Sequence, residues 1–320
     1  MWKQIKRIAG TPAQAAKHPD PAAHADQLIE NFTSRSSTDN LPDHVQTAQQ
    51  ALAPRRERDV ELRSSEPDFT DTPFHFVELV RALSKYKKSA PGEDHHTYEM
   101  IDHAPADFKL NLLHLINDSW AEGRLPYPWK TAIIQPIPKK NAPDAPRPIS
   151  LLSCLGKVME RMVHSRLKYK IGPLHKHIFG YKEGSSTTDA FCSLALIATD
   201  PAKTCKHCKP TAVFMDLEKA FKLTGRLPIT EALIQNGVWG DMLALPSDYF
   251  EGRSAKVQFQ RKLFRSLQLE NGTPHALILS PTLFNILMEK LVDLPFDPSV
   301  RTVSYADDVV IFAGDDHSET

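Results

Sequence analysis

The sequence predicts a mixed fold of the α+β or α/β class, because short apolar strands and longer amphipathic helices follow one another along the chain. A helix is predicted where apolar residues recur at three- and four-residue spacing, most clearly from Leu151 to about Tyr169. Strands are predicted at two short apolar runs, Thr131–Ile137 and Thr211–Met215. The run Val303–Phe312 has two apolar halves around an Ala-Asp-Asp centre, which predicts a hairpin with acidic residues at its tip.

The composition is that of a globular protein. The chain has 320 residues, of which 41% are hydrophobic and 24% charged, and a chain of this kind can bury a substantial core. No apolar run approaches the roughly 18 residues of a membrane-spanning helix, so we expect no membrane association. The basic first ten residues are not followed by an apolar stretch, which argues against a secretory signal.

The first 72 residues are predicted to form a poorly structured leader. They are rich in Ala, Pro, Asp, Gln and Arg, and the stretch Ser34–Pro67 has few large apolar residues with which to build a core. The segment His24–Phe32 is a short amphipathic exception.

Regular periodicity begins after the leader with two predicted helices, Pro73–Tyr86 and Leu110–Trp120. The first is expected to bury one apolar face, consisting of Phe76, Leu79, Val80 and Leu83. The second is expected to bury Leu112, Leu113, Leu115 and Ile116.

The remaining elements follow in order. The strand Thr131–Ile137 is expected to lead into a proline-rich polar loop and then into the helix that starts at Leu151. The run Thr211–Met215 is short, apolar and bounded by Pro210 and Asp216, which is typical of a buried strand. A last helix is predicted over Ser280–Val292. Its inward side chains are expected to be Leu283, Ile286, Leu287 and Leu291.

Formal net charge is zero, but the charge is unevenly distributed. From Ala121 to Lys182 there are twelve Lys and Arg against three Asp and Glu, a balance of 12 − 3 = +9. From Leu291 to Thr320 there are seven acidic residues and one Arg. A basic lobe and an acidic lobe suit a protein that binds phosphates with one surface and cations with another. Two solvated faces of unlike charge are the plainer alternative.

The four cysteines favour no metal or redox site. Cys205 and Cys208 form a CxxC, but a structural zinc site needs a second ligand pair, and none follows at the required spacing. Reduced thiols in an intracellular protein are the better interpretation.

The acidic pair at the predicted hairpin tip, Asp307 and Asp308, needs a physical explanation. Aspartate is a poor strand residue and adjacent like charges repel, whereas a divalent cation would neutralise both carboxylates with oxygen ligands. Asp216 ends a separate apolar strand in the same manner. If the two elements are neighbours in one sheet, the three acids could hold two Mg²⁺ ions about 3.5–4 Å apart, as two-metal phosphoryl transfer requires. The alternative is that these acids cap turns on an exposed hairpin.

Taken in order, several segments resemble the reverse transcriptase of non-LTR (LINE, jockey-like) retrotransposons. The matching stretches are Lys88–Asp94 (KSAPGED), Trp129–Lys140 (WKTAIIQPIPKK), Arg147–Leu167 (RPISLLSCLGKVMERMVHSRL), Phe179–Ala190 (FGYKEGSSTTDA), Val213–Phe221 (VFMDLEKAF), Leu279–Met288 (LSPTLFNILM) and Tyr305–Asp308 (YADD). The resemblance implies the α+β fingers and palm of a right-hand polymerase. It places an N-terminal extension and fingers at 73–205 and the palm at 206–320, with a reverse transcriptase domain from about 120. The palm sheet would be incomplete and the thumb missing.

The resemblance also implies roles for individual residues. Asp216, Asp307 and Asp308 would be the catalytic, metal-binding carboxylates, with the Leu217 carbonyl as a further metal contact. Phe221 resembles a steric gate that excludes a ribonucleotide's 2′-hydroxyl. Three cationic residues are expected to bind phosphates, Lys139 and Arg147 on the incoming triphosphate and Lys182, with the Gly184–Thr188 loop, on the template backbone.

The cofactors implied are two Mg²⁺ ions, with Mn²⁺ as a substitute, and the partners are an RNA template, a DNA primer and dNTPs. A retroelement protein is expected in the cytoplasm and nucleus. Three positions depart from the family pattern: Lys222 stands where Asp is usual, and His275-Ala276 where the family has Gln-Gly. These departures motivate a second hypothesis, a degenerate or co-opted relic that binds RNA through the basic lobe without catalysis.

Overall fold

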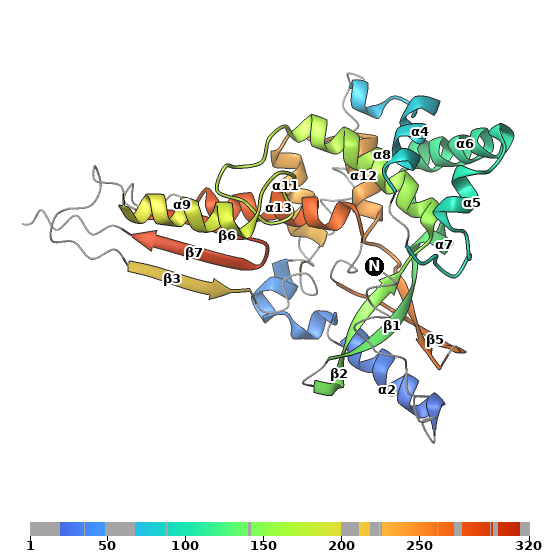
Figure 1. The fold of residues 1–320 in the computed structure, drawn as a ribbon, viewed down its shortest axis with the longest axis horizontal. Coiled ribbons are helices and arrows are strands. Elements are labelled where there is room, and N and C mark those ends of the chain that lie inside the picture. Colours follow the sequence, from blue (N-terminus) through green and yellow to red (C-terminus); the bar gives the residue numbers. More distant parts are fainter. Residues whose placement is uncertain are drawn as a thin grey trace, which may run out of the picture.

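Two separate β-sheets flank a group of packed helices in the computed structural model (Figure 1). The structure describes residues 20–34, 36–48, 68–86, 89–139, 142–199, 211–217, 224, 226–260, 262–271, 277–294, 296 and 300–313. The helices are α2 (Pro21–Ser34), α4 (Phe76–Ser84), α5 (Tyr98–Asp102), α6 (Ala106–Glu122), α7 (Tyr127–Lys130), α8 (Cys154–Ile171), α9 (Thr187–Thr199), α11 (Arg226–Gln235), α12 (Asp241–Asp248) and α13 (Leu279–Val292), with 3-10 turns η1 (Thr38–Asn40) and η2 (Phe69–Asp71). The strands are β1 (Thr131–Lys139), β2 (Ala142–Leu151), β3 (Thr211–Asp216), β4 (Ser254–Phe259), β5 (Lys262–Gln268), β6 (Val300–Tyr305) and β7 (Asp308–Ala313). The predicted α+β class is confirmed.

The larger sheet has the strand order β2-β1-β4-β5. Its outer pairs are antiparallel, and its central pair, β1 with β4, is parallel. Helix α2 packs against this sheet through Ala25, Leu28, Ile29 and Phe32, which contact a cluster of buried strand residues that includes Ile134 and Val257. The amphipathic segment of the leader is therefore a helix docked on the sheet. The boundary expected at residue 72 stays a prediction.

The proline-rich loop expected after Ile137 is wrong, because residues 142–151 form strand β2. This strand pairs with β1 in antiparallel register, with Ile134 opposite Ser150 and Pro136 opposite Pro148. Proline cannot donate to a β-ladder and is tolerated in edge strands. Since β2 is the outer strand of its sheet, its prolines are compatible with pairing on one side.

The main hydrophobic core lies among helices α4, α6, α8, α11, α12 and α13. Helix α8 is its centre, with Val158, Met159 and Val163 fully buried. The predicted helices are confirmed, but three side chains expected inside are exposed: Phe76, Val80 and Leu115. The buried face of α4 consists of Leu79, Ala82 and Leu83, and that of α6 includes Leu112, Leu113, Ile116 and Trp120. Phe76, Val80 and Leu115 lie at the edges of these faces.

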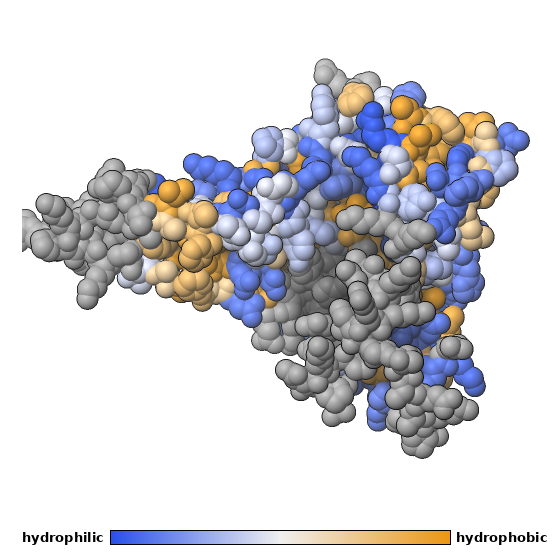
Figure 2. Space-filling model, viewed as in Figure 1, coloured by the Kyte–Doolittle hydropathy of each residue, from blue (hydrophilic) through white to orange (hydrophobic). Residues whose placement is uncertain are grey.

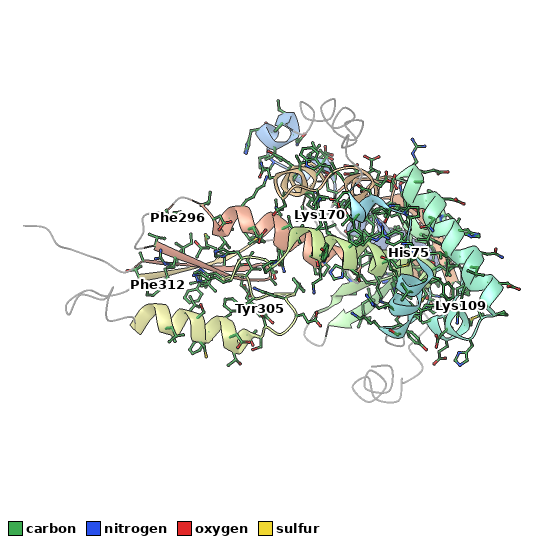
Figure 3. The ribbon with its side chains drawn as sticks, turned by 90° about the horizontal axis from the view of Figure 1, so that it is seen from above. His75, Lys109, Lys170, Phe296, Tyr305 and Phe312 are labelled. Atoms are coloured by element: carbon green, nitrogen blue, oxygen red, sulfur yellow. The ribbon has the colours of Figure 1, made fainter. Side chains whose placement is uncertain are left out.

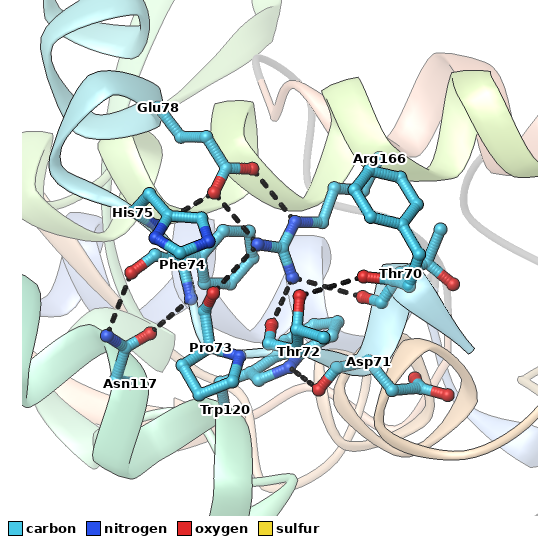
Figure 4. A network of polar contacts seen from close by, with 11 residues as sticks. Thr70, Asp71, Thr72, Pro73, Phe74, His75, Glu78, Asn117, Trp120 and Arg166 are labelled. Carbon is cyan, nitrogen blue, oxygen red and sulfur yellow. Dashed lines mark hydrogen bonds and ion pairs between the residues drawn. The ribbon is translucent and has the colours of Figure 1, made fainter. Parts of the chain in front are cut away.

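Arg166 of α8 links the segment before α4 to the core (Figure 4). Its guanidinium donates two 2.8 Å hydrogen bonds to the two carboxylate oxygens of Glu78. It also donates to the carbonyls of Thr70, Thr72 and Pro73. The guanidinium carbon lies 3.9 Å from the centre of the Phe74 ring, a cation–π contact. Burial opposes ionisation of Glu78, but the hydrogen bonds from Arg166 and from the His75 N–H outweigh it and lower the pKa of Glu78.

The smaller sheet is antiparallel, with the order β3-β7-β6, and extends away from the helical core in Figure 1. Val309 of β7 packs on α13 through Phe284 and Met288, together with Ile178. The hairpin predicted over Val303–Phe312 is confirmed as β6 and β7.

The burial predicted for Thr211–Met215 is wrong. Strand β3 forms, but its first four side chains are exposed, including Phe214 at 76%. It is an outer strand, and Met215 alone of the predicted run is partly buried against the cluster around α13. Exposed apolar residues of β3 and α9 form the hydrophobic area at the narrow end of the molecule (Figure 2). They include Phe191, Leu196, Val213 and Phe214.

Across the ranges that the structure describes, every helix is too short or too polar to cross a membrane.

Candidate functional site

The three acids singled out in the sequence lie together at one end of the smaller sheet. In the register of β3 with β7, the Cα of Asp216 is the partner of the Cα of Asp308. In the register of β6 with β7, Asp308 is also the partner of Tyr305. Residues directly opposite one another in neighbouring strands project to the same face of a sheet. Asp216, Asp308 and Tyr305 therefore form one row across the sheet.

Asp307 is joined to this row through the backbone. The Leu217 N–H donates a 3.2 Å hydrogen bond to the Asp307 carbonyl, which extends the β3–β7 pairing by one residue. Asp307 and Ala306 form the two-residue turn between β6 and β7. Ala306 has φ of 57°, in the left-handed region that a residue with a Cβ rarely adopts. The Ser304 hydroxyl donates to the Ala306 carbonyl at 3.3 Å and helps to hold this turn.

A segment from an earlier part of the chain, 177–181, runs beside β6 and supports the tip. Ser304 donates its N–H to the His177 carbonyl at 2.9 Å and accepts at its own carbonyl from the Phe179 N–H at 2.9 Å. The next residue, Gly180, lies against the turn: a Cβ on Gly180 would stand 2.7 Å from the Cα of Ala306. The Asn285 amide of α13 donates to the Gly180 carbonyl at 2.8 Å. These contacts fix strand β6, the turn at Ala306 and helix α13 relative to the segment 177–181.

The predicted site residues do not include Gly180 or Tyr181, although both lie in the stretch Phe179–Ala190 that resembles the family. Gly180 stands between two aromatic residues in Phe-Gly-Tyr, and an isolated glycine in such a run indicates close backbone approach. Tyr181 lies beside the acids: burial raises the pKa of its phenol, and the negative charge of Asp307 raises it further. Both residues are additions to the predicted set.

The carboxylates are accessible to a ligand, because Asp216 and Asp308 are exposed and Asp307 is half-buried. Carboxylate and carbonyl oxygens are the donors that Mg²⁺ and Mn²⁺ prefer, so the donor set fits these ions. Within the described part of the chain, however, no three Asp, Glu, His or Cys side chains are already gathered into a metal site. The backbone register brings the three acids to the same end of the sheet.

The remaining predicted residues are placed in part. Lys139 ends β1, and Arg147 of β2 pairs with Ile137 in the same ribbon, so the two backbones lie near one end of it. Lys182 is half-buried, and its ammonium donates to the carbonyls of Leu174 and His175 at 3.4 and 3.3 Å. In this structure Lys182 therefore stabilises its own loop. The following residues lie outside the described ranges: Cys205, Cys208, Phe221, Lys222, His275 and Ala276.

Comparison with known proteins identifies the family. The model of the "Reverse transcriptase (RNA-dependent DNA polymerase)" family matches residues 137–319, which include the hairpin and all three acids. The chain is 26% identical over 341 residues to the "RNA-directed DNA polymerase from mobile element jockey" of Drosophila funebris, an alignment that covers 97% of this chain and 35% of that protein.

Two further relatives give the same result. The "Probable RNA-directed DNA polymerase from transposon X-element" of Drosophila melanogaster is 25% identical over 257 residues, covering 76% of this chain and 28% of the relative. The "Retrovirus-related Pol polyprotein from type-1 retrotransposable element R2" of Popillia japonica is 26% identical over 269 residues. That alignment covers 77% of this chain and 36% of the relative. The chain thus spans about a third of the length of these relatives. It belongs to the reverse transcriptase family of RNA-directed DNA polymerases, in the group encoded by non-LTR retrotransposons.

Proposed function

We propose that this chain carries the fingers and palm of an RNA-directed DNA polymerase and contributes the catalytic carboxylates for adding dNTPs to a primer 3′-hydroxyl on an RNA template. The observation that carries the proposal is the pairing of Asp216 with Asp308, with Leu217 hydrogen-bonded to Asp307. Residues more than ninety positions apart in the sequence meet there as an acidic row open to solvent.

Two Mg²⁺ ions, or Mn²⁺ in their place, are the cofactors proposed for this row. Asp216, Asp307, Asp308 and the Leu217 carbonyl would hold them. Bound divalent ions supply a lowered pKa at an attacking hydroxyl and neutralise charge on the reacting phosphates. The exposed carboxylates leave room for a primer end and a triphosphate to approach from the same side.

The chain's own residues have the task of fixing where the carboxylates stand. The left-handed turn at Ala306 and the close contact with Gly180 set the direction of the hairpin tip. The β3–β7 pairing sets the separation of Asp216 from Asp308. Catalytic groups act efficiently when they are held in place before the substrate arrives, because the cost of ordering them is then already met by folding.

Substrate contacts are proposed for four further residues. Lys139 and Arg147, on the β1–β2 ribbon, would bind the triphosphate, Arg147 in a bidentate manner. Phe221 would stand as a bulky gate against a 2′-hydroxyl. Lys182 would meet the template backbone, which requires it to leave the carbonyls that it contacts in this structure.

Primer extension tests the proposal directly. The full chain is assayed with poly(rA)/oligo(dT), dTTP and Mg²⁺, beside Asp307→Asn and the matched variant Asp118→Asn, which alters an exposed acid of α6. We expect incorporation by the wild type and by Asp118→Asn. Loss of one metal-binding carboxylate should lower incorporation about 10²-fold or more, by analogy with other losses of transition-state stabilisation. Unchanged incorporation by Asp307→Asn would remove these acids from the mechanism.

A second measurement, calorimetric titration with Mn²⁺, needs no turnover. We expect the wild type and Asp118→Asn to bind, and Asp307→Asn to bind more weakly. Salt-sensitive RNA binding by a wild-type chain that takes up no Mn²⁺ would instead favour an RNA-binding protein without catalysis.

A further inference from the structure

Helix α13 carries a buried amide on the face that it turns toward the smaller sheet. Figure 3 shows α13 extending along this sheet. Phe284, Met288 and Val292 of the helix belong to the buried apolar cluster that also contains Val309 of β7. Asn285 lies in one row with Met288 and Val292, at the three- and four-residue spacing of a helix face, and is 1% exposed. An amide is therefore buried where its neighbours in the row are apolar.

Only half of the Asn285 amide is hydrogen-bonded. Its Nδ2 donates a 2.8 Å hydrogen bond to the carbonyl oxygen of Gly180. Its Oδ1 is buried and has no hydrogen-bond partner among the described residues. A buried acceptor without a partner costs free energy of folding, and an apolar side chain would avoid this cost. The contribution of Asn285 to the structure therefore depends on the one hydrogen bond that it donates.

The carbonyl that Asn285 holds belongs to the residue that contacts the hairpin tip. Gly180 is buried and lies outside the helices and strands, and within the described part of the chain its carbonyl accepts from no other donor. The backbone of Gly180 contacts Ala306, where a Cβ on Gly180 would stand 2.7 Å from the Cα. Ala306 directly precedes Asp307. One hydrogen bond and one backbone contact thus connect α13 with the acidic row.

The other contacts at this point leave the tip less well defined relative to α13. The 2.9 Å hydrogen bonds that Ser304 makes with His177 and Phe179 join the hairpin to the segment 177–181, so the two move together. The contact of Val309 with Phe284 is apolar packing. Such packing is non-directional, whereas a hydrogen bond requires a particular distance and angle. The bond from Asn285 therefore sets where segment and hairpin stand along the helix.

We propose that Asn285 is a positioning residue, which acts through Gly180 to fix the place of Asp307 and thereby the geometry in which the acidic row receives a divalent ion. The metal-binding consequence rests on the proposed function, whereas the positioning is a property of the metal-free protein. Groups that are held in place before a ligand arrives bind it more tightly, because less ordering remains to be done on binding.

Amide hydrogen exchange of the full chain in EDTA, followed by NMR, tests the positioning without metal or turnover. The reporters are the N–H groups of Phe179, Ser304 and Leu217, which are hydrogen-bonded around the tip. The amides of α8 report global opening and serve as the reference. In Asn285→Leu we expect the three reporters to exchange about three- to tenfold faster relative to α8, the effect of losing one hydrogen bond.

Leu283→Ala is the matched control on the same helix. Leu283 is fully buried and belongs to the main core, so its truncation lowers global stability without touching Gly180. The reporters should keep their wild-type rates relative to α8 in this variant. Asn285→Ala is a second variant that adds no bulk, and it should give the same acceleration as Asn285→Leu. Unchanged reporters in both Asn285 variants, or an equal acceleration in Leu283→Ala, would overturn the proposal.

Calorimetric titration with Mn²⁺ tests the consequence for the acidic row. Wild type and Leu283→Ala should bind alike, and Asn285→Leu about three- to tenfold more weakly, since a tip that samples several positions is competent in only a fraction of them. A wild type that binds no Mn²⁺ would remove the proposed function, while the exchange rates would still decide whether Asn285 positions the tip. Equal Mn²⁺ affinity of wild type and Asn285→Leu would overturn the connection between Asn285 and the metal.

Discussion

Gly180 lies in direct contact with the backbone of Ala306, so that a Cβ on Gly180 would stand 2.7 Å from the Ala306 Cα and closer still to its nitrogen. Real Cβ atoms do not approach backbone atoms so closely, and neither partner is a flexible side chain. One residue near the middle of the chain therefore limits how the acidic hairpin can be positioned.

Gly180→Ala should destabilise the protein and displace the hairpin tip. We expect a loss of about 1–3 kcal/mol in the free energy of unfolding, since overpacking forces backbone shifts. Urea unfolding measures it. The control is Gly184→Ala, where the new Cβ meets open space and only the positive φ of 79° is unfavourable. A smaller loss for Gly180→Ala than for Gly184→Ala would contradict the close contact.

Arg166 should be among the most sensitive residues for stability. Arg166→Met leaves the partly buried Glu78 carboxylate and three backbone carbonyls without their donor, and breaking a buried pair in this way costs about 3–5 kcal/mol. Lys168→Met, on the same helix, removes an ion pair with Glu183 whose side chains are 49% and 89% exposed, and should change little. Equal midpoints of urea unfolding for the two variants would refute the role assigned to Arg166.

The periodic and motif-bearing elements could be predicted from the sequence. The hairpin, helix α8 and helix α13 can each be predicted from their own residues. Alternating apolar residues in a strand, or apolar residues at three- and four-residue spacing in a helix, indicate which side faces the core. The adjacency of Asp216 and Asp308 could also be anticipated, since a metal-binding role requires it. Their role as catalytic ligands stays a prediction.

Other features depend on partners that a local pattern does not contain. Strand β2 has the prolines of a loop and is a strand because β1 supplies hydrogen bonds on one side. Strand β3 has the composition of a buried strand, yet Val213 and Phe214 are exposed because it is an outer strand. The placement of Gly180 against Ala306 is a contact across 126 positions in the sequence, which no local rule supplies.

His164 should make stability depend on pH. Burial lowers its pKa to about 4, helped by the charge of Lys168, and its ring contacts the Thr282 hydroxyl at 2.8 Å. In the unfolded chain the pKa of His164 has its usual value near 6.5. Between pH 6.5 and 4, His164 is therefore largely protonated in the unfolded chain and largely neutral in the folded chain. Stability is therefore fully present above pH 6.5 and is lost as the pH falls toward 4, by at most about 3 kcal/mol.

The measurement for His164 is urea unfolding between pH 4.5 and 7.5. His164→Gln keeps a polar group for Thr282 and should flatten the dependence, whereas His114→Gln, an exposed residue of α6, should not. Because other groups titrate in the same window, the comparison is the difference between variant and wild type at each pH. An identical slope for His164→Gln and wild type would rule out this residue as a source of acid sensitivity.

Replacing one acid of the acidic row should change stability in opposite directions with and without a divalent ion. Like charges directly opposite in a sheet are destabilising, so in EDTA and low salt Asp308→Asn should raise the free energy of unfolding by roughly 0.2–1 kcal/mol. A ligand that binds the folded state stabilises it by RT ln(1 + [L]/Kd), and Mg²⁺ should therefore raise the melting temperature of the wild type and scarcely that of Asp308→Asn. Asp118→Asn should follow the wild type in both buffers. A gain from Asp308→Asn that is the same with and without Mg²⁺ would mean that Asp216 and Asp308 repel each other but bind no metal.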